Sequence, residues 1–406
     1  MFPCKHINTF MACDLCNTFK INFMKLYSPL LFIALMFAAC NKQEIALTSP
    51  QSLQVASSAK QHNTGNIKTR VLNNTLNYPW EITWGPDNMI WFTEREGRVK
   101  KINPQTGAVT HIATIAEVAT TTTFNGLLGM AIHPQFSSNP YVYLVYNYFD
   151  AQGSYMEKIA RYTYDGVTLG SPLTLVDGIV GKIGGMFIHN GSRLMIGPDM
   201  KLYATTGDAN LRFELPQNTA KLNGKVLRVN LDGSIPSDNP YGNAVWSIGH
   251  RNAQGLTYGN NRWYSSEHGE TTDDEINIIE RARNYGWPYV EGYCNLPAEQ
   301  TFCAANNVKE PIYAWTPVIA PSGINYYNNN EIAQWKNSLL VTSLKGKRLV
   351  QMKLNSDGST VEGVHEYFNN QFGRLRDVAV SPEGIVYICT DNGNNQDMII
   401  EVTKGK

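Results

Sequence analysis

Residues 84–94, WGPDNMIWFTE, recur in altered form as GPDMKLYATTGD at 197–208 and as SPEGIVYICTDN at 381–392. Each copy places a turn before a short run of β-branched and aromatic residues, which favour β-strands. Looser copies of the same pattern lie at 133–148, 259–270 and 335–346. Six similar units along one chain indicate a repeat architecture.

A second strand-like segment with its own turn follows each copy. Several of these turns hold Asp-Gly or Thr-Gly, pairs that accept a positive φ. The six segments are 97–109, 157–166, 224–235, 274–286, 347–358 and 397–406. No long amphipathic helical pattern interrupts the series, so the sequence favours an all-β fold.

The blade count follows from the number of units. A unit of this kind cannot bury both faces of its sheet alone, so the units must pack on one another in a closed ring. The sequence predicts a six-bladed β-propeller with four-stranded antiparallel blades over 71–406. Because the last unit ends at the C-terminus, we expect residues near 70–80 to supply its outer strand. A pair of β-sandwiches, or a propeller with another number of blades, is the alternative.

The N-terminal region carries an export signal. From Met24 the chain reads MKLYSPLLFIALMFAAC, an apolar run that is too short for an ordinary transmembrane span. Two alanines before Cys40 are similar to a bacterial lipoprotein processing site. We therefore expect residues 1–40 to be a signal region, with Met24 as the true start and Cys40 as a lipid-modified N-terminus in the cell envelope. An ordinary signal peptide is the alternative.

The rest of the composition limits the partners. Residues 41–70 are polar and are expected to form a flexible tether. The formal net charge is zero, so no overall field favours nucleic acid or an anionic membrane, and we expect a membrane contact only through the lipid anchor. Cys294 and Cys303 lie close together in an exported chain and are predicted to form a disulfide. A metal site there is the weaker interpretation, because no second Cys/His pair lies nearby.

Polar residues beside the inner strands are the candidate site residues, because ligands of propellers bind over the central channel. His189 begins HNGSRLMIGPD at 189–199, and an imidazole there could act as a general base or serve only the fold. Arg251 and Asn252 lie in GHRNAQGL at 249–256, between glycines that let the backbone approach a ligand. A solvated turn is the alternative.

Charged residues gather in three further segments. The stretch SSEHGETTDDEINII at 265–279 holds five acidic residues and could bind Ca²⁺, although it lacks the EF-hand pattern. Lys345 in LKGKR, and Arg374 and Arg376 in GRLRD, could bind an anionic ligand. The acidic stretch could bind a metal or be a solvated loop, and both interpretations stay open. For the basic residues, the alternative is that they are surface cations without a ligand.

Taken together, the chain resembles the glucose/sorbosone dehydrogenase family from about residue 76 to 406. The segments that carry the resemblance, in order, are NGLLGMAIHPQF, HNGSRLMIGPD, GKVLRVNLDGSIPSDNPYG, GHRNAQGL, DDEINII and NYGWP. The resemblance implies oxidation of the anomeric carbon of an aldose sugar to the lactone. It also implies PQQ and Ca²⁺ as cofactors and an external electron acceptor.

The resemblance also implies residue roles. His189 would be the general base, Arg251 and Asn252 would contact PQQ, and Arg251 would lie near its reactive carbonyl. Lys345, Arg374 and Arg376 would face the PQQ carboxylates. The remaining implied positions are backbone calcium ligands at Gly269 and Glu270, a second calcium site at Glu275 and Tyr285, and an aromatic beside the substrate at Trp315.

Two positions depart from the family pattern. Phe124 stands where the family's glucose dehydrogenase has a glutamine near the substrate, and Ile188 stands where it has an aspartate. The first bears on sugar specificity, and the second weakens the charge support for His189 and with it the expected catalysis. A non-catalytic extracellular binding module is therefore the alternative function. A calcium-dependent hydrolase is less favoured, because the acidic residues are confined to one loop.

Overall fold

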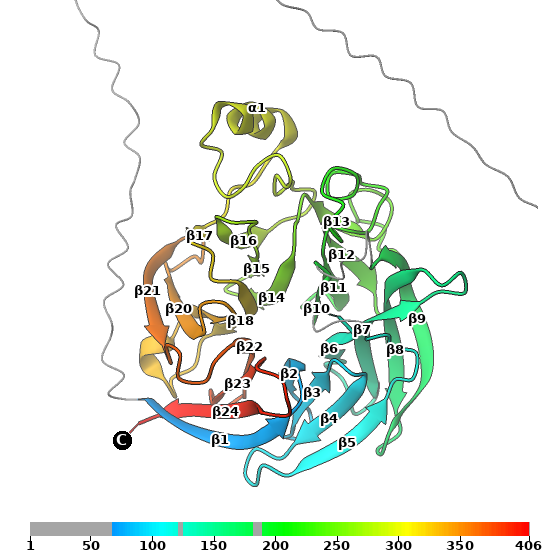
Figure 1. Ribbon diagram of the computed structural model, residues 1–406, viewed down its shortest axis with the longest axis vertical. Helices are drawn as coiled ribbons and strands as arrows, with labels where there is room; N and C mark the ends of the chain where they lie inside the picture. Colours follow the sequence, from blue (N-terminus) through cyan, green and yellow to red (C-terminus); the bar gives the residue numbers. More distant parts are fainter. Residues whose placement is uncertain (1–66, 121–124, 182–188, 406) are drawn as a thin grey trace, which may run out of the picture. The chain divides into compact units, whose positions relative to one another are not determined.

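The structure is a computed structural model that describes residues 67–120, 125–181 and 189–405. Its strands form six four-stranded antiparallel sheets arranged as the blades of a propeller (Figure 1). The first three sheets are β2 (Pro79–Trp84), β3 (Ile90–Glu94), β4 (Arg98–Ile102) and β5 (Val109–Thr114); β6 (Leu127–Ile132), β7 (Tyr141–Phe149), β8 (Tyr155–Tyr164) and β9 (Leu169–Val180); and β10 (Gly191–Ile196), β11 (Lys201–Thr206), β12 (Lys225–Asn230) and β13 (Val245–Ile248).

The other three sheets complete the ring. They are β14 (Ala253–Gly259), β15 (Arg262–Glu267), β16 (Asp274–Ile279) and β17 (Tyr313–Trp315); β18 (Pro321–Tyr327), β19 (Ser338–Ser343), β20 (Arg348–Leu354) and β21 (Val361–Tyr367); and β22 (Leu375–Val380), β23 (Val386–Thr390) and β24 (Asp397–Lys404) with β1 (Ile67–Leu76). The first strands of consecutive blades pack on one another around the axis. The predicted fold, including the number of blades, is confirmed.

The strand β1 closes the ring. It lies antiparallel to β24, with Ile67 opposite Lys404 and Leu76 opposite Asp397. Arg70 of β1 also donates to Glu401 of β24 over 2.7 Å. The expected tether therefore ends too late at residue 70, because the backbone of β24 extends far enough to pair with residues from Ile67 onward.

Six apolar clusters hold the blades together, and each one joins two neighbouring blades. Trp91 of β3, for example, packs with Leu127 of β6 and Leu144 of β7. Phe92, on the other face of β3, packs with Tyr387 of β23, which brings the first blade against the last. Alternate residues of one strand thus bury against opposite neighbours, so no blade has a complete core by itself.

One helix was not predicted. α1 (Pro297–Asn306) lies between β16 and β17 and projects from the fourth blade (Figure 1). Pro297 at the first helical position and Glu299, which accepts from the backbone of Leu296 over 2.9 Å, mark its beginning. The predicted disulfide joins Cys303 on this helix to Cys294. Within the three described stretches, no helix has the length and apolar character needed to cross a membrane.

Candidate active site

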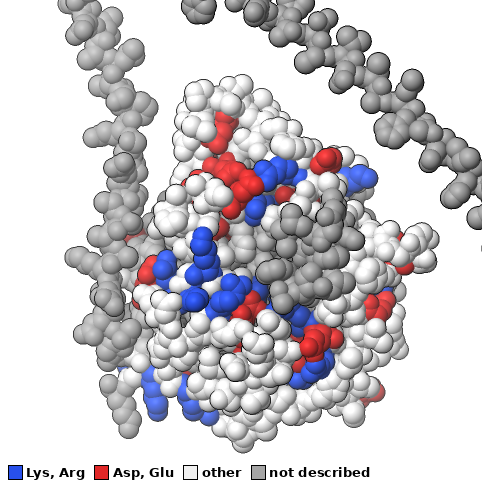
Figure 2. All heavy atoms as spheres, viewed as in Figure 1, with Lys and Arg blue, Asp and Glu red and all other residues white. Residues whose placement is uncertain are grey.

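A cavity of about 220 Å³ lies over the central axis. Every blade contributes to its wall. The lining residues are Trp80, Leu128, His189, Asn190, Gly191, Asn252, Gln254, His268, Ala320, Leu344, Arg374 and Arg376. Basic side chains gather near the centre of the face that Figure 2 shows, and acidic ones lie nearer α1. Four of the predicted residues, His189, Asn252, Arg374 and Arg376, therefore share one cavity.

His189 is held by a buried carboxylate. Its Nδ1 lies 2.7 Å from Oδ1 of Asp208, and the other Asp208 oxygen accepts from Nε1 of Trp287 over 2.8 Å. A carboxylate at Nδ1 holds that nitrogen protonated, which leaves Nε2 as the proton acceptor. Asp208, just after β11, thus gives His189 a carboxylate partner that the sequence analysis did not foresee. Ile188 itself lies outside the described residues.

Backbone contacts fix the two segments that carry this pair. The amide of Asp208 donates to the carbonyl of Arg251 over 2.8 Å, and Gly207 donates to Asn190 over the same distance. A side chain at Gly207 would place its Cβ 1.7 Å from the carbonyl oxygen of His189. Only glycine allows this approach, so the Gly207-Asp208 pair that ends the repeat has a second role beside the site.

Three arginines share one carboxylate at the cavity wall. Asp391 lies 2.7 Å from Nη2 of Arg376, 3.1 Å from Nη2 of Arg374 and 3.2 Å from Nη2 of Arg95. Burial acts to raise the pKa of Asp391, but the arginines hold it below its usual value. Nε of Arg376 is buried and has no partner among the described residues. The cluster therefore has an excess of positive charge, which favours an anionic ligand.

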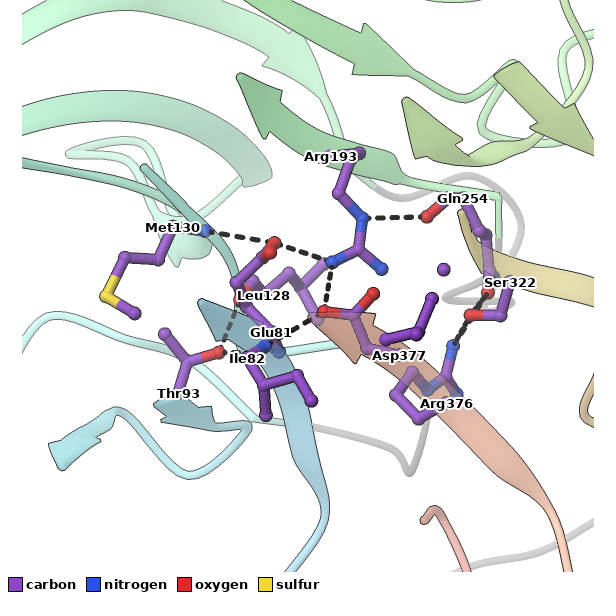
Figure 3. Close-up of polar contacts among 12 residues, drawn as sticks. Glu81, Ile82, Thr93, Leu128, Met130, Arg193, Gln254, Ser322, Arg376 and Asp377 are labelled. Atoms are coloured by element: carbon purple, nitrogen blue, oxygen red, sulfur yellow. Dashed lines mark hydrogen bonds and ion pairs between the residues drawn. The ribbon is translucent and has the colours of Figure 1, made fainter. Parts of the chain in front are cut away.

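A buried ion network lies next to the cavity and joins the blades (Figure 3). Nη1 of Arg193 contacts Glu81 over 2.6 Å and Asp377 over 2.9 Å. The Arg193 guanidinium also lies 4.2 Å from the ring centroid of Trp80, which lines the cavity. The sequence analysis missed Trp80, because its neighbours come from blades that are remote in sequence.

Two predicted cations lie outside the cavity wall. Lys345 is exposed, and no described residue partners its side chain. Arg251 borders a smaller neighbouring cavity, with its guanidinium 5.2 Å from the ring centroid of Trp287. Burial lowers the pKa of Arg251, and its Nε has no partner among the described residues. Arg251 therefore retains a donor for a ligand.

His268 is a further residue that the sequence analysis missed. It lines both cavities, lies 2.8 Å from the carbonyl oxygen of Pro321 through Nε2, and lies 3.3 Å from Nδ2 of Asn252 through Nδ1. Burial lowers the pKa of His268 to about 3, so the ring is neutral at pH 7. It can therefore donate to Pro321 and accept from Asn252. Acidic residues flank His268 in the sequence, and that stretch was interpreted only as a possible calcium site.

The predicted backbone calcium ligands lie beside Arg251. The Glu270 carboxylate is engaged by Arg212, whose Nη1 lies 2.9 Å away, so that side chain is not offered to a metal. The amide of Gly269 donates to Asp274 over 2.9 Å. Only the carbonyl groups of these two residues stay available, which is the role that the family resemblance implies.

The other predicted calcium ligands, Glu275 and Tyr285, line a cavity of about 10 Å³ with further acidic residues. Burial, and then the nearby Glu267, raise the pKa of Glu275 to about 8. Carboxylates gathered in this way are ligands that calcium prefers. The Tyr285 hydroxyl, however, already donates to Ile278 over 2.6 Å. Over the described residues no three His, Cys, Asp or Glu side chains stand together as a metal site.

One of the two predicted substrate residues, Trp315, can be placed, and it does not line the cavity. Trp315 is buried in the apolar cluster between the fourth and fifth blades, so it packs in the core instead of forming the cavity wall. Trp80 is the tryptophan that lines the cavity. Phe124 and the lipidation position Cys40 lie outside the described residues.

Glu157→Gln should remove a pH dependence of stability. Glu157 is buried, accepts from Ser192 over 2.7 Å, and has a pKa raised to about 8 by burial. A carboxyl with a raised pKa stabilises the fold while it is protonated, and this contribution is lost as the pH rises toward 8. Between pH 5 and 9 the free energy of unfolding should fall by on the order of 1–3 kcal/mol more in the wild type than in the variant. Urea unfolding measures the difference.

The control for this prediction is Glu96→Gln, which changes an exposed carboxylate that pairs with Arg98. Its pH dependence should match that of the wild type. If the free energy of unfolding changed equally with pH in Glu157→Gln and in the wild type, Glu157 would be ionised in the folded protein at neutral pH.

Known proteins are similar to this chain over most of its length. The family model described as "Glucose / Sorbosone dehydrogenase" matches residues 76–400. Quinoprotein glucose dehydrogenase B of Acinetobacter calcoaceticus is 34 % identical, over 81 % of this chain and 86 % of that protein. Aldose sugar dehydrogenase YliI of Escherichia coli is 28 % identical, over 81 % of this chain and 91 % of that protein. The PQQ-bound aldose sugar dehydrogenase of Streptomyces coelicolor is 31 % identical, with a TM-score of 0.72 over 83 % of this chain and 98 % of that chain.

Proposed function

Because the chain belongs to the glucose/sorbosone dehydrogenase family, we propose that it oxidises the anomeric carbon of an aldose sugar to the lactone, with PQQ and Ca²⁺ as cofactors. The oxidation releases two electrons and two protons, and the electrons pass to an external acceptor. The observation that carries this proposal is His189, which lines the cavity together with Arg374 and Arg376 and is paired with Asp208 behind it.

The cavity suits PQQ, a flat acid with three carboxylates. Arg374 and Arg376 bring more positive charge than Asp391 neutralises, and Trp80 and Leu128 add apolar wall. Lys345 follows the lining residue Leu344, has no side-chain partner in the described ranges, and would meet a further carboxylate. When bound, PQQ supplies a quinone that accepts two electrons, and Ca²⁺ polarises that quinone.

The protein residues move and hold the proton. Nε2 of His189 takes the proton of the anomeric hydroxyl, and the Asp208 carboxylate stabilises the imidazolium that forms. Arg251, with its unpartnered Nε, stabilises negative charge that develops beside it. The neutral ring of His268 orients Asn252 toward the cavity.

Calcium is held, in this proposal, by the carbonyl groups of Gly269 and Glu270, with a second ion at Glu275 and Tyr285. Support comes from the donor chemistry, because the small cavity beside Arg251 gathers Glu267, Glu275 and further acidic residues.

We also propose that the protein is exported and is anchored in the cell envelope through a lipid on Cys40. The disulfide between Cys294 and Cys303 supports export, because disulfides persist in oxidising compartments.

PQQ added to the apoprotein with Ca²⁺ should change the visible absorbance and saturate near one equivalent. Removing Ca²⁺ with EGTA should weaken this binding, because a cation held by the Gly269 and Glu270 carbonyls would add positive charge for the anionic cofactor. The loaded protein should then reduce an artificial acceptor when it is given members of an aldose panel. Absence of PQQ binding would favour the non-catalytic binding module. PQQ binding without oxidation of any aldose would point to Phe124 and Ile188 as the positions that changed the activity.

A further inference from the structure

The lysine of the GKVLRVNLDGSIPSDNPYG segment has no role in the proposed chemistry, although the structure buries it completely. Lys225 begins β12 and is 0 % exposed. Its Nζ donates to the carbonyl oxygens of Leu215 over 2.7 Å, Pro216 over 2.9 Å and Asn223 over 2.6 Å. All three N–H bonds of the ammonium are thereby used.

No carboxylate neutralises this charge. Lys225 has no ion pair with any residue in the described ranges, and only carbonyl dipoles surround its ammonium. Burial lowers the pKa of Lys225 to about 7, so the charge depends on the carbonyl oxygens, because hydrogen bonds to a charged form favour that form. A buried ion of this kind costs free energy, and its contacts must offset that cost.

The three carbonyl groups belong to one segment. Residues 207–224 connect β11 to β12 without a strand, and they include Asp208 near the start. A backbone hydrogen bond joins the two ends of the segment, because Gly224 donates to Gly207 over 2.9 Å. Lys225 follows Gly224 directly, and its ammonium extends back into the segment.

A chain of hydrogen bonds runs from the ammonium to Asp208. The Leu215 carbonyl accepts from Lys225, the amide of Leu215 donates to Leu211 over 3.2 Å, and the amide of Leu211 donates to Asp208 over 2.8 Å. Successive links meet at one residue, first Leu215 and then Leu211, so each contact restrains the backbone that carries the next one.

A second route reaches the other side of the site. The Pro216 carbonyl accepts from Lys225 and also from the amide of Gly249 over 3.0 Å. Gly249 lies two residues before Arg251, whose carbonyl in turn accepts from the amide of Asp208. The ammonium is therefore bonded to the 207–224 segment directly, and it is linked to the segment of Gly249 and Arg251 through the Pro216 carbonyl that both donors share.

We propose that Lys225 is a positioning residue, an internal cation that orders residues 207–224 and so holds the Asp208 carboxylate against His189. The ordering of the segment stands on the structure alone, whereas the effect on turnover rests on the proposed function. A Lys225→Ala variant should contain a cavity lined by these three carbonyl groups, of which only that of Asn223 has no other donor among the described residues. That cavity should accept propylammonium, which replaces the deleted atoms.

Trypsin tests the ordering without any cofactor or substrate. Arg212 lies within the segment, and its cleavage rate reports how often the segment opens. In the apoprotein, Lys225→Ala should raise the rate of cleavage at Arg212 by about 10- to 100-fold, as expected for the loss of hydrogen bonds to a charged group. Propylammonium should reverse most of this increase, whereas propanol, which has the same length but no charge, should not.

Two further variants guard the interpretation. Lys221→Ala removes an exposed lysine from the same segment and should leave cleavage at Arg212 unchanged. Lys225→Met keeps most of the side-chain volume but removes the charge. It replaces Lys225→Ala in the trypsin experiment if the alanine variant does not fold. It should be cleaved faster than the wild type, and propylammonium should not protect it, because the space is filled.

Turnover gives the second readout. With PQQ bound, Lys225→Ala should lower kcat by about 10-fold or more and change the PQQ affinity by less than about 3-fold, because Arg374 and Arg376 lie on another blade. Propylammonium should restore kcat together with trypsin resistance.

Wild-type cleavage in Lys225→Ala, or equal protection by propanol and propylammonium, overturns the proposal. Ordering by propylammonium without recovery of kcat refutes the role toward Asp208. A wild type that oxidises no aldose refutes the proposed function and leaves the trypsin result to decide the ordering.

Discussion

Replacing His189 with alanine should lower turnover by about 10²–10⁴ on every aldose that the protein oxidises, the usual size of a general-base contribution. The imidazole lines the cavity, and Asp208 holds its Nδ1 over 2.7 Å, so Nε2 is the acceptor that the variant loses. The affinity for PQQ should change little, because the proposed function assigns its carboxylates to Arg374 and Arg376. Steady-state rates with an artificial acceptor, and an absorbance titration with PQQ, measure both quantities.

The matched variant for this experiment is Asp208→Asn. It keeps the shape of the carboxylate but can donate to Nδ1 of His189, which would then leave Nε2 protonated and unable to act as the base. Turnover should fall in this variant as well, with PQQ binding retained. Wild-type turnover in His189→Ala would exclude the assigned base and favour the binding module.

Replacing Lys345 with alanine should have the opposite effect and weaken PQQ binding by about 10- to 100-fold, the range expected for one hydrogen bond to a charged group. The rate at saturating PQQ should stay close to that of the wild type. Lys345 suits this test because its side chain is exposed and has no partner among the described residues. Its removal therefore leaves the packing of the fifth blade intact.

The control is Lys347→Ala, which removes another exposed lysine from the same turn. PQQ titrations of the two variants at low and moderate salt should separate a specific contact from the general field of the surface. If both variants bind PQQ as the wild type does, Lys345 lies away from the cofactor. If both lose affinity equally, only the overall charge matters.

The sequence predicted the fold because each blade repeats the same local signals. A turn before an alternating strand is visible in any one copy. The short last unit indicated an outer strand from residues near 70–80, and the structure has β1 there, paired with β24 from Ile67 to Leu76. α1 was missed because one short helix in a long connection has few residues to show a period. Its signals were only Pro297 and the capping contact of Glu299.

The site was predicted less completely, for a different reason. His189, Asn252, Arg374 and Arg376 could be identified because they lie in distinctive segments. Asp208, His268 and Trp80 could not, because their roles depend on side-chain contacts that the sequence pattern does not show. Asp208 meets His189 of the same blade, His268 meets Asn252 of its own blade and Pro321 of the next, and Trp80 packs on Arg193 of another blade. Trp315 is the opposite case. Its position in the sequence matches the family's aromatic residue beside the substrate, but its ring lies in the apolar core, because a matching position does not determine which residues surround it.

The pairing of β1 with β24 has a consequence for synthesis. Arg70 and Glu401, which meet across this pair, are separated by 331 positions, so the ring cannot close until almost the whole chain has left the ribosome. Until then β1 is an unpaired edge, and edges of this kind invite pairing with other chains. Contacts so distant in sequence also form slowly. A chain that stopped before Asp397 would contain five complete blades but lack the β1–β24 pairing that closes the ring. Its β1 edge would stay exposed, and chaperones and proteases could recognise it.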